Sequence, residues 1–142
     1  MTNIMKWTGI LATLVIVIIL PIYSLRETAQ QEKLLQSYHT DAVVAATDLY
    51  AENCAICHGA AGEGIGDNPA VNTDALRSIS EIDLYRVISR GRDSTLMAAW
   101  ALDEGGIFTP QQINDFITLI QHANWEYVSV RVDDLGLTPP EM

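Results

Sequence analysis

The sequence predicts a mainly α-helical protein with one N-terminal transmembrane helix, a small all-α domain and an extended C-terminal tail. Three observations lead to this prediction: an uncharged apolar run near the N-terminus, apolar residues at helical spacing after it, and no alternating strand pattern longer than the short, edge-like run 126–132. The expected boundaries are 1–25 for the membrane anchor, 26–40 for a helical stalk, 41–123 for the domain and 124–142 for the tail.

Composition limits the functions open to the chain. Its 142 residues are 49% apolar, which excludes a disordered segment, and 18 acids against 8 Lys and Arg give a net charge of −10. This charge argues against a nucleic-acid partner and against a polybasic membrane-surface protein. After residue 38 the chain has sixteen acids, five arginines and no lysine, which disfavours a freely diffusing carrier that docks through a ring of lysines.

The apolar run at residues 7–25 is the expected anchor in the lipid bilayer. It contains no Asp, Glu, Lys, Arg or His, and as a helix it would span roughly 28 Å, close to the ~30 Å hydrocarbon thickness. Trp7 and Tyr23 fall near the two interfaces, and Pro21 is expected to kink or end the helix. A cleaved signal peptide is the alternative, but its apolar region would be shorter, and residues 22–36 contain no A-x-A-like cleavage site.

Charges on either side of this run predict its orientation. Lys6 and the α-amino group precede it, whereas the four charges between Arg26 and Lys33 sum to zero. The positive-inside rule therefore places the N-terminus in the cytoplasm and everything after Arg26 on the opposite side of the membrane.

The first half of the domain is expected to be helix followed by loop. Residues 26–40 are rich in helix formers and predict the stalk. Apolar residues at i, i+3, i+4 and i+7 along 41–54 predict a short amphipathic helix that leads into the two cysteines. Four glycines within residues 59–66 then predict a loop.

Two further helices have recognisable starts. Ser80 followed by Asp83 predicts a helix start, and Gly91 predicts the end of that helix. Thr109 before Pro110 predicts the start of the next helix, with proline in the first helical position. The apolar stripe expected on that helix consists of Ile113, Phe116, Ile117 and Ile120.

The only two cysteines lie in the segment Cys54-Ala55-Ile56-Cys57-His58, which is C-x-x-C-H, the attachment signature of c-type haem. Two thiols one helical turn apart can each form a thioether with a different haem vinyl, and the next imidazole then lies under the iron. A thioredoxin-like dithiol would need a βαβ setting, and a zinc site would need four ligands, for which only His39 and His122 remain. The motif therefore predicts one covalent haem c.

Compartment and size agree with this prediction. Haem attachment takes place outside the cytoplasm, where the charge of Lys6 also places the domain. The domain is small enough that its protein core alone would stabilise it only marginally, and a covalently held macrocycle would supply the missing apolar core.

Residues 41–123 resemble a class I monohaem cytochrome c. The stretches that carry the resemblance are Tyr50-x-x-x-Cys54, Cys57-His58-Gly59, the glycine loop with Asn68-Pro69-Ala70, Gly91-x5-Met97-Ala98-Ala99-Trp100, and Gly105-Gly106-Ile107-Phe108-Thr109 before the last helix.

The resemblance implies that Met97 is the distal iron ligand opposite His58, and that the Pro69 carbonyl accepts the Nδ1 hydrogen of His58. Two departures are Ala46 and Ala98, where the family often has glycine and proline. They are expected to loosen the helix packing and the methionine loop.

Met97 has one rival as the distal ligand. It is the only methionine in the domain, because Met1 and Met5 precede the anchor or lie at its start and Met142 ends the tail. The rival is His122 on the last striped helix, where a histidine is more often a surface or core residue, and His39 is expected to be a solvated stalk residue.

Ligation by His58 and Met97 would leave the iron no open position, so the expected role is single-electron transfer at an exposed haem edge. Residues 60–66 and the methionine loop are expected to frame this edge. Four arginines lie close together in sequence, and they either form a solvated helix face or supply a partner for a haem propionate: Arg77, Arg86, Arg90 and Arg92.

The tail 124–142 contains several large apolar residues, including Trp125 and Val128. It is expected either to wrap the surface of its own domain or to dock on a neighbouring subunit.

These features favour a membrane-anchored electron-transfer subunit of a respiratory or photosynthetic complex, on the periplasmic side of a bacterial inner membrane. The anchored form, acidic surface and tail are similar to the monohaem cytochrome c subunit of alternative complex III, a quinol-oxidising assembly. That resemblance implies a multihaem cytochrome and iron–sulfur subunits as neighbours and a soluble redox acceptor. The alternatives are a stand-alone tethered shuttle, and a haem sensor or peroxidase with an open sixth position.

Overall fold

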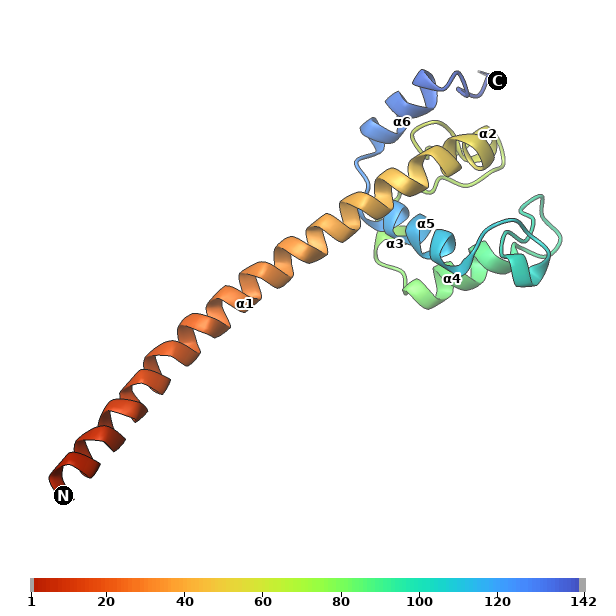
Figure 1. Cartoon of the computed structure of the whole chain (residues 1–142). Coiled ribbons are helices and arrows are strands. Elements are labelled where there is room, and N and C mark those ends of the chain that lie inside the picture. The colour runs from red at the N-terminus through yellow and green to blue at the C-terminus, as the bar shows by residue number, and fades with distance from the viewer. Residues whose placement is uncertain (1, 141–142) are drawn as a thin grey trace. The chain divides into compact units, whose positions relative to one another are not determined.

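The computed structural model describes residues 2–140 and divides into two compact units, Met1–Tyr38 and His39–Met142. Met1, Glu141 and Met142, at the ends of the expected anchor and tail, lie outside the described residues. The chain is mainly helical, as predicted, and the described residues form no β-strand. The helices are α1 (Thr2–Asn53), α2 (Ala55–His58), α3 (Asp74–Arg77), α4 (Glu81–Arg90), the 3₁₀ turn η1 (Leu102–Glu104), α5 (Pro110–His122) and α6 (Trp125–Asp134), as Figure 1 shows.

The first unit is helical from residue 2 to its end, as part of α1. Pro21 lies inside this helix and does not end it. The most apolar 18-residue window of α1 has a mean hydropathy of 2.4, and none of it is buried. By length and composition, this part of α1 can cross a membrane. The stalk at 26–40 is helical too, and α1 is assigned without a break from the expected anchor to Asn53.

In the second unit, the predicted helix ends are confirmed. The hydroxyl of Ser80 accepts the backbone N–H of Asp83 at the start of α4, and Gly91 follows the helix with a positive φ of 70°. At the start of α5, Thr109 and Gln112 form a capping box, with proline in the first position. The four residues of the predicted stripe are all buried: Ile113, Phe116, Ile117 and Ile120.

The tail folds as a helix, so the strand-like interpretation of residues 126–132 is wrong. Asn124 caps α6, since its side-chain oxygen accepts the backbone N–H of Glu126 at 2.9 Å. Val128 and Val132 are fully buried, whereas Val130 between them is 54% exposed. Valines at every second position over so short a run fit both the two-residue period of a strand and the period of a helix. In the helix, the valines four residues apart are the buried ones.

This helix packs on its own domain, which is the first of the two expected outcomes for the tail. Arg131 donates two hydrogen bonds to the carboxylate of Asp48, at 2.6 and 3.1 Å, and these hydrogen bonds hold the pKa of Asp48 below its usual range. The ring of Trp125 meets that of Tyr50 edge to face at 5.5 Å. It also lies so close to Gly62 that a Cβ there would come within 2.6 Å of it.

Shortening Val128 tests this packing. We expect Val128→Ala to lower the free energy of unfolding by about 2 kcal/mol, because two buried methyl groups are lost and a cavity remains. The matched control is Val130→Ala on the exposed face of the same helix, which should change it by less than about 0.5 kcal/mol. Urea unfolding of the full-length haem protein in mild detergent measures both. Equal losses in the two variants would contradict the packing of α6.

Candidate functional site

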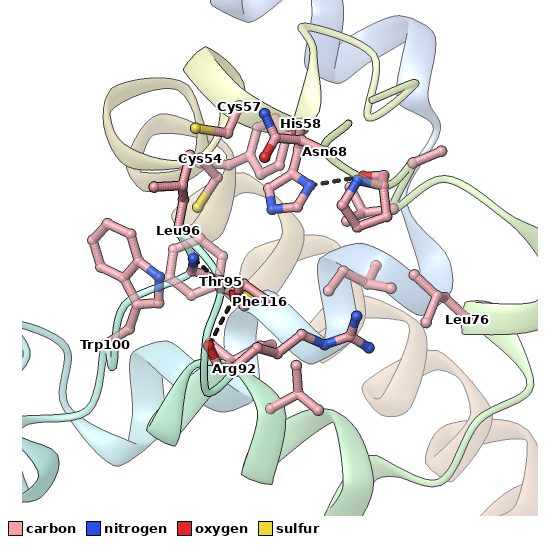
Figure 2. A pocket seen from close by; sticks show the side chains of 18 of the residues that line it. Cys54, Cys57, His58, Asn68, Leu76, Arg92, Thr95, Leu96, Trp100 and Phe116 are labelled. Carbon is pink, nitrogen blue, oxygen red and sulfur yellow. Dashed lines mark hydrogen bonds between the residues drawn. The ribbon is translucent and has the colours of Figure 1, made fainter. Parts of the chain in front are cut away.

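The C-x-x-C-H motif forms one helical turn directly after α1. The Cys54 N–H donates to the Tyr50 carbonyl at 2.8 Å, and the N–H of His58 donates to the Cys54 carbonyl at 2.9 Å. The Tyr50 hydroxyl then donates to the carbonyl of Gly59 at 2.7 Å, closing the turn from the other side. As a result, both thiols and the imidazole reach the same cavity (Figure 2).

This cavity has a volume of about 520 Å³, within the range of about 300–1,000 Å³ usual for cofactor sites, and it is partly open to solvent. All five residues that the sequence singled out line it: Cys54, Cys57, His58, Pro69 and Met97. Most of the remaining wall is apolar, with side chains from α3, α4, α5 and the loops between them: Val71, Leu76, Leu84, Val87, Ile88, Trp100, Phe116 and Ile120.

The ring of His58 is held in one orientation. Its Nδ1 lies 2.8 Å from the carbonyl oxygen of Pro69. A carbonyl can only accept, so Nδ1 carries the hydrogen, and the lone pair is then on Nε2. Gly64, with a φ of 84°, allows the loop to return to the imidazole, because a Cβ there would come within 2.6 Å of the Asn68 carbonyl oxygen.

Met97 is held by the turn that follows α4. The Arg92 N–H donates to the Met97 carbonyl at 3.0 Å, and the Thr95 hydroxyl accepts the Met97 N–H at 3.2 Å. A Cβ on Gly91 would come within 2.3 Å of the Met97 carbonyl oxygen, so only glycine lets the two segments approach this closely. These contacts hold the methionine loop although Ala98, where the family often has proline, is exposed. Ala46, where the family often has glycine, is fully buried in the core.

Two expectations about the site differ from the structure. The loop 60–66 does not line the cavity; residues 67–71 do so instead. Part of 60–66 lines a second hollow of about 450 Å³ together with residues 138–140. His122, the rival to Met97, does not line the cavity. Its ring stacks on that of His39 with centroids 4.1 Å apart, so His39 is not an isolated solvated residue.

The histidine pair predicts a dependence of stability on pH. Partial removal from water, and then the nearby His39, lower the pKa of His122 from its usual 6.5. The unfolded chain therefore binds this proton more readily, and stability is lost as the pH falls through about 6.5. We expect His122→Gln to lose less stability than the wild type between pH 7 and pH 5 in urea titrations. The same loss in both proteins would contradict the shift.

The Cys54 thiol differs from that of a reactive dithiol. Burial, and secondarily the neighbouring Cys57, raise the pKa of Cys54 to about 12, so its thiol is protonated at neutral pH and a poor nucleophile. No group of three or more His, Cys, Asp or Glu side chains that could hold a metal ion gathers within residues 2–140. A haem c fits the residues present: two thiols on one turn, an oriented imidazole, a thioether and an apolar cavity of suitable size.

Sequence reasoning missed parts of the wall. Helix α3 is only four residues long, and Thr73, whose hydroxyl accepts the Leu76 N–H, is the signal that could have found it. A row of rings supports the wall behind Trp100: Phe108 lies 5.4 Å from Trp100, and Phe116 lies 4.9 Å from Phe108. Gly106 permits this row, because a Cβ there would meet the Trp100 backbone at 2.1 Å.

Comparison with known proteins agrees with this geometry. The family model described as cytochrome C oxidase, cbb3-type, subunit III matches residues 41–118, more than half of the chain. The match covers most of α5 and every residue that lines the cavity except Ile120, and it leaves the apolar part of α1 and all of α6 outside. No curated protein and no solved structure matches the chain.

Proposed function

Because the chain belongs to the family of cbb3-type cytochrome c oxidase subunit III domains, and so is a class I cytochrome c with a covalent haem c, we propose that His58 and Met97 are the two axial ligands of its iron. Cys54 and Cys57 are the proposed thioether ligands of the macrocycle. The observation that carries this proposal is that these four residues line a single apolar cavity, with the His58 ring already oriented by Pro69.

The haem supplies a one-electron couple between ferric and ferrous iron, and the chain's own residues set its properties. The Pro69 carbonyl fixes the tautomer of His58 by accepting its Nδ1 hydrogen, which leaves the lone pair of Nε2 available. A thioether at the second axial position raises the reduction potential relative to a second histidine. The largely apolar wall disfavours extra charge at the site, which favours the ferrous state.

His58 and Met97, if both bound the iron, would leave no open position for oxygen or peroxide. The proposed role is therefore the transfer of single electrons, with this chain as an electron-transfer protein that can serve in a larger oxidoreductase. A sensor or peroxidase would need Met97 to leave the iron, and the turn from Arg92 to Met97, with its two hydrogen bonds, supports the opposite.

We further propose that residues 7–25 anchor the chain in a bacterial inner membrane, with the haem domain on the periplasmic side. The support is the exposed apolar surface of this part of α1 and the distribution of charge around it.

A fixed place in a membrane electron-transport complex is the proposed setting, with alternative complex III as the narrower candidate. The stalk 26–40 is helical, whereas a swinging shuttle would favour a flexible Gly/Ser linker. The buried face of α6 is occupied by its own domain, so neighbouring subunits must bind elsewhere, and the acidic surface favours partners with basic faces.

Native mass and haem content after extraction in mild detergent test the setting. We expect a particle several times larger than the 15.6 kDa chain, with more than one haem per copy of it. Co-purification of a multihaem cytochrome and iron–sulfur subunits would support the narrower candidate. A small particle with one haem that still transfers electrons between two membrane complexes would establish the tethered shuttle instead.

A further inference from the structure

We propose that the guanidinium of Arg92 binds a propionate carboxylate of the haem. The inference deepens the proposed function and rests on the haem c that the family implies. It identifies one of the four clustered arginines, which the sequence alone could not tell apart.

The haem adds negative charge to a part of the chain that is already acidic. A haem brings two propionate carboxylates into a chain that, after residue 38, already has sixteen acids against five arginines and no lysine. An anion at the edge of an apolar cavity is costly unless a cation or hydrogen-bond donors meet it. The polar part of the cavity wall consists mainly of neutral side chains and the acid Asp67, and among the described residues that line it Arg92 is the only Arg or Lys.

The other four arginines after residue 38 already have hydrogen-bond or ion-pair partners. Arg77 donates to the carbonyl of Ala123 at 3.3 Å. Two form ion pairs with acids: Arg86 with Asp83 at 2.8 Å, and Arg90 with Glu104 at 2.9 Å. Arg131 forms an ion pair with Asp48 of α1, 83 positions earlier in the sequence.

Arg92 differs from these four. Within residues 2–140 its guanidinium has no hydrogen-bond or ion-pair partner, and its side chain lines the cavity. Figure 2 shows this side chain extending from the methionine loop across the cavity in the direction of Leu76. The backbone of Arg92 is fixed by its hydrogen bond to the Met97 carbonyl at 3.0 Å. A planar guanidinium fork held at this position matches a carboxylate, which can accept two of its N–H groups.

The test compares the reduction potentials of two charge-neutralising variants of the full-length haem protein. Arg92→Gln should shift the ratio of reduced to oxidised protein at a fixed applied potential by about tenfold toward the oxidised form, the Coulombic effect of one partly screened charge at the cavity edge. For one electron, tenfold corresponds to about 59 mV. Arg90→Gln, the matched control two residues away and outside the cavity wall, removes the same charge and should shift the ratio by less than about threefold.

A second readout distinguishes direct binding from a general charge effect. The carboxylate stretching bands of the propionates in the redox-difference infrared spectrum should move in Arg92→Gln and in Arg92→Lys, because lysine keeps the charge but loses the fork. They should stay in place in Arg90→Gln. If Arg92→Gln fails to fold or to take up haem, Arg92→Lys decides the question through these bands alone.

Haem content measured on every variant distinguishes a failure of the proposed function from a failure of the role proposed for Arg92. Wild-type protein without covalent haem would overturn the proposed function. One haem per chain, with equal potentials in Arg92→Gln and Arg90→Gln and unmoved bands in Arg92→Lys, would overturn the role of Arg92 and leave the proposed function intact.

Discussion

Replacing Met97 with alanine should turn a closed haem site into one that binds carbon monoxide. The ferrous wild-type protein should bind almost none if His58 and Met97 are both iron ligands, as proposed; the variant should bind it at almost every haem, with a lowered reduction potential. Alanine cannot reach the iron, and the turn at 92–97 offers no other sulfur or imidazole among the described residues. Absorption spectra under carbon monoxide and a potentiometric titration measure the two effects.

The control lies one residue away. Leu96 is 91% exposed, so Leu96→Ala removes an apolar side chain from the same turn without removing a ligand. It should bind no more carbon monoxide than the wild type. Ready binding by the wild type would mean that Met97 does not occupy the sixth position, and would favour a sensor or peroxidase. A closed site in Met97→Ala that opens only when His122 is also replaced would make the rival histidine the ligand.

Removing both cysteines should release the haem from the chain. In Cys54→Ala/Cys57→Ala no thioether can form, so haem-dependent staining of the denatured polypeptide should vanish. Ile56→Ala, a change at the exposed residue between the two thiols, should retain the stain. A stained double variant would show that the attachment is elsewhere.

The same double variant should also lose its stable fold. Without the haem, the apolar wall of the 520 Å³ cavity would lose its packing partner and face water. This loss falls on a domain whose whole free energy of unfolding is typically only about 5–15 kcal/mol. We therefore expect urea to unfold the double variant in a broad, early transition, whereas Ile56→Ala should unfold at nearly the wild-type urea concentration.

Local signals in the sequence were sufficient wherever a structural feature depends on a few neighbouring residues. The starts of α4 and α5 follow from Ser80 and Thr109, whose side chains cap the helices that follow them. The C-x-x-C-H turn is likewise local, and its spacing alone places three groups on one side of a helix.

Features that depend on distant partners could not be read in this way. The side of α6 that is buried depends on Asp48 and Tyr50, which the sequence does not show to be near. The four clustered arginines look alike in sequence, and they are distinguished only by the acids and carbonyls that the fold brings to three of them. The helical stalk after the anchor was predicted, but the sequence did not show that the stalk and the helix expected at 41–54 belong to one helix, α1.

The contact of Arg131 with Asp48 also constrains the order of events during biogenesis. The two residues are 83 positions apart, and Trp125 lies against the loop that directly follows the haem-attachment turn. Helix α6 is the last of the described helices in the chain, so it is synthesised after the two cysteines. The attachment turn is therefore made before its last packing partner, and closure of the domain by α6 is expected to be a late step in folding.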